Sequence, residues 1–203
     1  EIIETLPDTP GNLRRIVYAW MNLGTVYRHM RDFAEARSCY EESLKRARVI
    51  GHRETESDSL QHLGINEHLW GRMHRREGVN LIEACEHQFR AWESLVSSLE
   101  IARESGWRKA IASGLHRLAK IYREIYRLQT MPVEDSALDF REALQKLQQK
   151  AQAYQMPFEV EYEYDLLMPG SFSTLGWLEK AARLFEVSAL IADETSDYHR
   201  ALD

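Results

Sequence analysis

Five side chains that could bind a metal ion fall within 26 residues: His62, His68, His74, Cys85 and His87. Histidine and cysteine are the usual ligands of zinc, so a metal site is the first chemistry to consider. The three leading histidines are six residues apart, and on a helix each such step turns the side chain by roughly 600°, whereas ligands at i and i+4 share a face. No HExxH motif is present. We therefore expect no metal site, either structural or catalytic.

Motifs of catalysis and of nucleotide binding are also missing, since the sequence contains no GxSxG, no GxxxxGK[ST] and no GxGxxG. Cys39 adjoins the aromatic Tyr40 at a helical packing position, which is typical of a buried, unreactive thiol. We expect no enzymatic activity and no cofactor. One alternative stays open, a helical metal-dependent hydrolase that uses Glu67, His68 and the histidine-bearing segment around them.

The charge balance and the cysteine content restrict the class of protein. Lys and Arg number 26 against 32 Asp and Glu, a net charge of −6, which argues against generalised binding to nucleic acid or to anionic membranes. The longest uncharged run, 166–178, has thirteen residues and contains Pro169-Gly170, too short and too broken for a bilayer span. Two cysteines without CxxC spacing indicate no disulfide framework and fit a reducing, cytoplasmic setting.

Two packing patterns with helical spacing alternate along the chain. The first places apolar or small residues at i, i+3, i+4 and i+7, and the second mixes one large residue with several small ones. The first pattern comprises Trp20, Leu23, Gly24 and Tyr27, then Leu60, Leu63 and Gly64, then Leu115, Leu118, Ala119 and Tyr122. The second comprises Ala36, Tyr40, Ser43, Leu44 and Ala47, with copies from Ala91, Ser136 and Ala181 that place Ser98, Ala143 and Ser188 at the position of Ser43. The alternation predicts helix pairs in series.

The stretch from Trp20 to Tyr27, followed by Ala36, Tyr40 and Ser43, closely resembles the tetratricopeptide repeat, whose pattern is W-x2-L-G-x2-Y and then Ala, an aromatic and a small residue. The resemblance implies an all-α, right-handed superhelical solenoid of three to four antiparallel helix pairs. It also implies a non-catalytic module that binds a protein or a peptide.

We expect one domain over 1–203, with units at about 12–51, 54–106, 107–155 and 157–203. The second unit contains an insertion, 71–88, that either lengthens its paired helices or forms an extra helix. The fourth unit opens with apolar and acidic residues in alternation over 158–165, which is a strand signal. A helix is our expectation there, and an extended segment would instead present an acidic edge to a partner.

The long units also resemble the arrays of large bacterial regulators of the STAND ATPase type. That resemblance implies that the chain is part of a larger protein, in which it serves as the sensor or scaffold region of a signal-transduction regulator. A directly peptide-gated regulator is the alternative, in which a short peptide fills the groove and tightens the superhelix.

In tetratricopeptide arrays the first helix of each pair lines the concave groove. In the third unit one face of this helix is basic, and it carries Lys109, His116, Lys120, Arg123 and Arg127. Such a stripe fits an acidic peptide or a phosphate group, although a solvated helix face partly neutralised by Glu124 is the plainer interpretation. Chaperone binding is not expected, because Met21 and Thr25 stand where the family's carboxylate clamp needs Lys and Asn. The expected partner-binding groove consists of Tyr18, Met21, Thr25, Arg28, Gln61, His68, Lys109, His116, Lys120, Arg123 and Arg127.

Overall fold

The computed structural model describes residues 10–78, 80–132, 138–153 and 176–200, and these contain helices and no strand. The segment 158–165, whose pattern is a strand signal but for which we expect a helix, lies outside the described residues. The helices are α1 (Pro10–His29), α2 (Phe33–Val49), α3 (Arg53–Glu77), α4 (Leu81–Glu104), α5 (Arg108–Gln129), α6 (Leu138–Ala153) and α8 (Trp177–Arg200). None of these helices is long and apolar enough to cross a bilayer.

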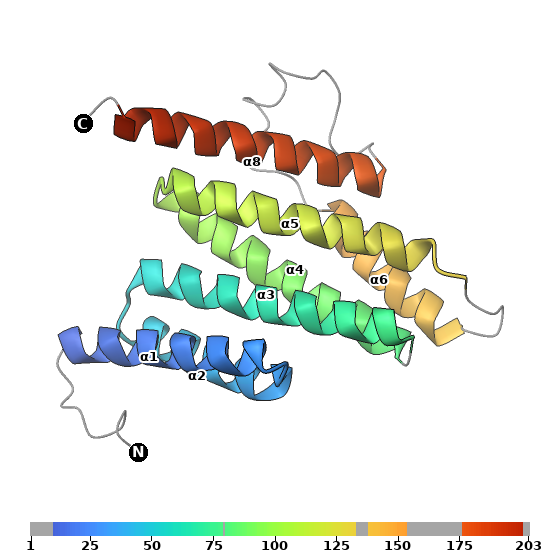
Figure 1. Ribbon diagram of the computed structural model, residues 1–203, viewed down its shortest axis with the longest axis horizontal. Helices are drawn as coiled ribbons and strands as arrows, with labels where there is room; N and C mark the ends of the chain where they lie inside the picture. Colours follow the sequence, from blue (N-terminus) through green and yellow to red (C-terminus); the bar gives the residue numbers. More distant parts are fainter. Residues whose placement is uncertain (1–9, 79, 133–137, 154–175, 201–203) are drawn as a thin grey trace.

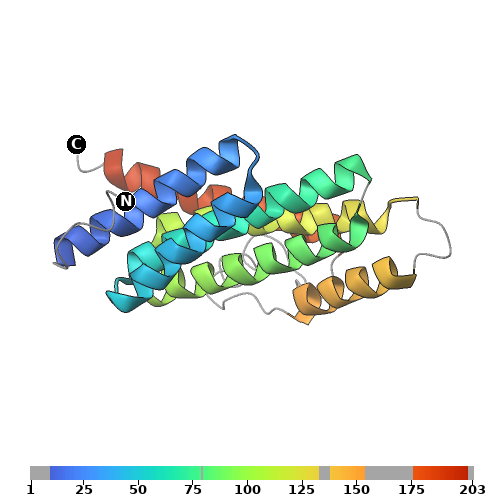
Figure 2. The same cartoon turned by 90° about the horizontal axis from the view of Figure 1, so that it is seen from below.

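The helices form an all-α, tetratricopeptide-like solenoid, as the alternating patterns predict. In Figure 1, α1, α3, α5 and α8 succeed one another from bottom to top, with α2, α4 and α6 behind them. Figure 2 shows the same two rows from below. Each of the helices α2 to α5 packs against the helix that precedes it in the chain. The first helices of successive pairs therefore lie in one row.

Close contact within the pairs depends on glycines of the first pattern. A Cβ atom at Gly24 would lie 2.8 Å from Cε1 of Tyr40, and one at Gly64 would lie 2.8 Å from Cγ of Leu95. Both separations are shorter than real Cβ contacts, so a side chain at either position would push the paired helices apart. The pairing of a small residue with a large one therefore sets the distance between the helices.

The insertion 71–88 lengthens both helices of the second pair rather than adding a third helix. Helix α3 continues to Glu77, and Gly78 ends it with a left-handed φ of 65°. Helix α4 begins soon afterwards, because the side chain of Asn80 accepts a hydrogen bond from the backbone N–H of Glu83 at 3.1 Å. A tight turn thus joins two long antiparallel helices.

A serine of the second pattern joins the helices within each pair. Ser43 Oγ donates to the carbonyl of Val17 at 3.2 Å, and Ser98 Oγ donates to that of Ser57 at 2.9 Å. Ser188 of α8 donates in the same way to the carbonyl of Ala112 in α5, at 2.9 Å. Helix α8 therefore stands to α5 as α2 stands to α1.

This pairing differs from the expected units 107–155 and 157–203, in which α6 would be the partner of α5. Helix α5 packs far more extensively against α8 than against α6, and α6 packs mainly on α4. The copy of the pattern in α6 has Ala143 at the serine position, so it lacks the hydroxyl that bonds the first helix in the other pairs.

Candidate anion-binding site on the first helices

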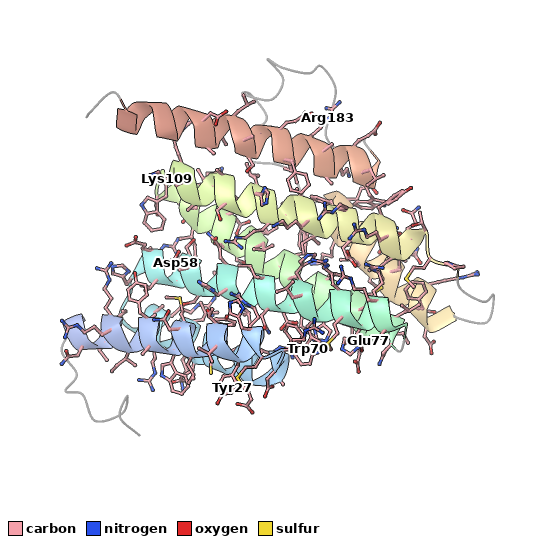
Figure 3. The ribbon with its side chains drawn as sticks, viewed as in Figure 1. Tyr27, Asp58, Trp70, Glu77, Lys109 and Arg183 are labelled. Carbon is pink, nitrogen blue, oxygen red and sulfur yellow. The ribbon has the colours of Figure 1, made fainter. Side chains whose placement is uncertain are left out.

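Five cationic side chains and one histidine on α1, α3 and α5 lie close enough for their charges to act on one another. We call this group the basic cluster. Helix α5 is its main source, because its 22 residues carry six Arg or Lys and a single acid, Glu124. Figure 3 shows nitrogen-bearing side chains gathered along the facing sides of α3 and α5. The members of the basic cluster are Arg28, His62, Arg72, Arg117, Lys120 and Arg123.

Burial, and after it repulsion within the cluster, lowers the pKa values of His62, Arg72, Arg117 and Lys120. Burial, followed by the charges of Arg28 and Arg117, lowers the pKa of His62 to about 4. Burial also lowers the pKa of Lys120, and the charges of Arg117, Arg123 and Arg72 lower it further. Since positively charged side chains of the cluster face one another, positive charges outnumber negative ones there.

Several buried nitrogen atoms of the cluster have no hydrogen-bond partner within the described part of the chain. They are Arg28 Nη1, His62 Nδ1, Arg72 Nε and Arg123 Nε. A buried donor without an acceptor costs free energy, and more so when it is charged. The arrangement therefore offers donors for which the described residues supply no acceptor.

Aromatic rings hold two of the cluster arginines in place. The guanidinium of Arg28 lies 5.7 Å from the ring centroid of Tyr40, and the Tyr40 ring in turn stacks on His62 at 5.4 Å. Arg123 lies over Phe185 of α8, also at 5.7 Å. These contacts restrict the side chains without neutralising their charge.

Four of the expected groove residues lie in the basic cluster or beside it. Arg28, Lys120 and Arg123 are members, and the exposed His116 meets the edge of the Phe185 ring at 5.0 Å. Charges of Lys120 and the cluster arginines add to burial in lowering the pKa of His116. Three residues of the basic stripe expected on α5, His116, Lys120 and Arg123, therefore lie close together, and their role in binding stays a prediction.

Three expected groove residues are buried between helices. Met21 packs in an apolar cluster with Val17, Gln61 accepts a hydrogen bond from Ser113 at 3.3 Å, and His68 bonds Gln88 at 2.9 Å. Burial lowers the pKa of His68 to about 4. These side chains hold the solenoid together and do not face a partner.

The other four expected groove residues are not members of the cluster, although the charge of Arg127 acts on Arg72. Tyr18 is half-buried, with the guanidinium of Arg14 5.9 Å from its ring, and Lys109 is exposed at the start of α5 (Figure 3). Thr25 shares a hydrogen bond of 3.2 Å with the Tyr40 hydroxyl. The Arg127 side chain donates to Glu124 at 3.2 Å, so its charge is already paired.

Arg72, Arg117 and His62 are the cluster members that sequence reasoning missed. Arg117 is one residue from the predicted His116, and its side chain donates to Ser113 at 3.2 Å. A search of the helical wheel of α5 for every cation would have found it. Arg72 belongs to the extension of α3, so only the length of that helix brings it opposite α5.

A second charged cluster joins α2, α3 and α4, and we call it the paired cluster: Arg37, Glu67 and His87. The guanidinium of Arg37 donates two bonds to the Glu67 carboxylate, each of 2.6 Å, and His87 Nδ1 lies 2.8 Å from Glu67 Oε2. Burial alone would raise the pKa of Glu67, but these hydrogen bonds and the charge of Arg37 together lower it. His68, the neighbour of Glu67, has Gln88 as its partner instead, so the two side chains do not form a common site.

The comparison with known families agrees with the first repeat. Residues 15–75 match the family model of the tetratricopeptide repeat. This segment runs from α1 through α2 into α3 and includes the Gly24–Tyr40 contact. The match covers less than half of the chain.

Tetratricopeptide repeats are protein–protein interaction modules and are generally not catalytic, which agrees with the expected class of function. The search of curated proteins gave no match to the chain. The identity of the partner must therefore be argued from the side chains.

Proposed function

We propose that this chain is a non-catalytic protein-binding module that receives an acidic peptide segment on the basic cluster. The observation that carries the proposal is the set of buried Arg and His nitrogens, contributed by α1, α3 and α5, that have no hydrogen-bond partner among the residues that the structure describes. The first helix of each pair is also the one that lines the groove in arrays of this repeat type.

Carboxylates would supply what the basic cluster lacks. Each would accept charge-assisted hydrogen bonds from guanidinium or imidazolium donors, and such bonds are roughly twice as strong as neutral ones. A bound anion would also relieve the repulsion that lowers the pKa values of His62 and Lys120. A protein or peptide partner is favoured over nucleic acid because the chain as a whole has a net charge of −6.

The wider role that we propose is the sensor or scaffold region of a larger cytoplasmic regulator of bacterial type. The long second unit, with α3 of 25 residues and α4 of 24, supports this proposal because long units are a feature of those arrays. Capture of a partner on the first helices would then alter how the array contacts an attached domain.

A peptide-gated form of this mechanism has its own support in the electrostatics. Arg28 of α1 lowers the pKa of Arg117 in α5, so like charges from the first and third pairs repel one another. A peptide whose carboxylates lie between them would replace repulsion by attraction and draw the pairs together. Small-angle scattering would then give a smaller radius of gyration with peptide than without it.

A labelled octaglutamate peptide provides the test of acidic-peptide binding, with fluorescence anisotropy as the readout. We expect saturable binding that weakens as salt is raised, and at least a tenfold loss of affinity in the double variant Lys120→Glu/Arg123→Glu. The matched control is Lys45→Glu/Arg103→Glu, which makes the same charge change at exposed positions of α2 and α4. Equal losses in both double variants would show that only net charge matters, and the proposal would fail.

A further inference from the structure

We infer that His74, Glu83 and His87 form a binding site for a divalent transition-metal ion of the zinc class, at the turn between α3 and α4. One potential ligand atom from each of the three side chains lies within 4.8 Å of the other two. His74 Nε2 is 3.3 Å from Glu83 Oε2, and the two histidine rings lie 5.3 Å apart and nearly parallel, at 8°. This site is separate from the basic cluster and does not depend on it.

The ligands come from two helices, which is why spacing along one helix did not reveal them. Glu83 and His87 are at i and i+4 on α4, the spacing at which two side chains share a helical face. His74 lies in the last turn of α3, and the tight turn after Gly78 brings it against that face. At the lower right of Figure 1, the end of α3 and the start of α4 meet.

The paired cluster orients His87 for metal binding. His87 Nδ1 lies 2.8 Å from Glu67 Oε2 and 3.2 Å from Arg37 Nη2. Because the ionised carboxylate can only accept, the shorter of these two contacts makes His87 Nδ1 the donor to Glu67. That tautomer leaves the lone pair of His87 Nε2 free for a metal ion. A carboxylate behind a ligating histidine is the common arrangement in zinc sites, where it fixes the ring and increases its basicity.

His74 and Glu83 supply the remaining ligands. His74 Nε2 is a buried nitrogen that makes no hydrogen bond to the described residues, although Glu83 Oε2 lies 3.3 Å from it. The His74 ring stacks against Trp70 (labelled in Figure 3) at 6.3 Å. The side chain of Glu83 is 49% exposed, so it can move toward an ion. Ligands in a tetrahedral zinc site lie roughly 3.3 Å apart, so binding requires the three side chains to approach one another by small rotations.

The donor set favours zinc over the abundant hard cations. Two imidazoles and one carboxylate match the three protein ligands of many zinc sites, with the fourth position open to water, whereas calcium and magnesium prefer oxygen ligands throughout. The charge of Arg37 does not oppose the ion, because Glu67 neutralises it. A bound ion would join the end of α3 to the start of α4.

Metal titration of the chelator-treated chain tests the inference. We expect calorimetry to show one Zn²⁺ ion per chain and Co²⁺ to give the visible absorption of a four-coordinate site. His74→Ala and Glu83→Gln should each weaken Zn²⁺ binding at least tenfold while the helical circular dichroism is unchanged. The matched control is His116→Ala, which removes an exposed histidine of α5 and should leave the affinity unchanged.

Two results would overturn the inference. One is the absence of stoichiometric Zn²⁺ binding to the wild-type chain. The other is Zn²⁺ binding that His74→Ala and Glu83→Gln leave as tight as His116→Ala does, since the ion would then be bound elsewhere.

Discussion

The basic cluster and the paired cluster are both partly buried groups of charged side chains on neighbouring helices, but only one of them is neutralised. In the paired cluster, Glu67 accepts hydrogen bonds from Arg37 and His87. In the basic cluster the described residues place Arg28 and Arg117 against one another, and burial followed by this repulsion lowers the pKa values of Arg117 and His62. The paired cluster joins three helices of the solenoid, whereas we propose that the basic cluster receives its negative charge from a bound partner.

The comparison makes opposite predictions for the stability of the two clusters. Removing one partner of a buried ion pair leaves an uncompensated charge and is strongly destabilising. Removing one charge from a group that repels itself relieves repulsion instead. Stability and partner binding should therefore depend on different residues.

The largest expected effect is at the centre of the paired cluster. Glu67→Gln should lower the free energy of unfolding by about 3 kcal/mol, because Arg37 loses the carboxylate that neutralises it and His87 loses the acceptor of its hydrogen bond. Urea unfolding followed by circular dichroism measures the change. The control is Glu93→Gln, which removes an exposed carboxylate from α4 and should change stability by less than about 0.5 kcal/mol. A loss at Glu67 no greater than the loss at Glu93 would remove the contrast between the clusters.

A smaller effect should appear on acidification, through His62 of the basic cluster. Its pKa is about 4 in the folded chain, against 6.5 for an ordinary histidine in an unfolded chain. The unfolded chain therefore binds more protons between these two pH values. Stability should therefore fall as the pH falls from about 6.5 to 4, and by pH 4.5 this histidine alone should have cost about 2 kcal/mol.

His62→Gln is the variant that isolates this contribution. It should lose about 2 kcal/mol less than the wild type does between pH 7 and pH 4.5, as measured by urea unfolding at each pH. His68, whose pKa is also about 4, contributes with the same sign in both proteins and so cancels in the difference. An equal acid sensitivity of wild type and variant would contradict the burial and repulsion assigned to His62.

The smallest effect on stability is expected at Arg117. Arg117→Gln should change the free energy of unfolding by less than about 1 kcal/mol, because the lost hydrogen bond to Ser113 is offset by relieved repulsion. The same variant should raise the pKa of His62, which is measurable by NMR titration of the imidazole. A destabilisation as large as that of Glu67→Gln would mean that Arg117 has a structural partner.

The sequence was sufficient for the fold because the packing residues are local. Gly24 and Tyr40 belong to one pair, and their spacing carries the geometry of their contact. The serine positions Ser43, Ser98 and Ser188 were also visible as a repeated pattern, and each bonds the paired helix. What the pattern did not contain is that α8, rather than α6, would supply the partner of α5.

The charged sites were only half visible because they are assembled between helices. The stripe on α5 could be read from one helical wheel, but Arg28 and Arg72 join it from other helices. His74 failed a spacing test along a single helix and His87 was not part of that test, yet the α3–α4 turn brings their rings together. Spacing along the chain describes one helix at a time, whereas these sites depend on two or three.

We propose that the basic cluster binds an anionic partner, and a measurement of the pKa of His62 during peptide binding is the sharpest test of this proposal. His68 is the comparison residue, because burial is the main cause of its low pKa, the charges of Arg72 and Lys120 contribute less, and its hydrogen bond is to Gln88. We predict that saturating octaglutamate raises the pKa of His62 by at least about one unit, measured by NMR, while that of His68 stays near 4. A bound peptide that leaves the pKa of His62 unchanged would contradict the claim.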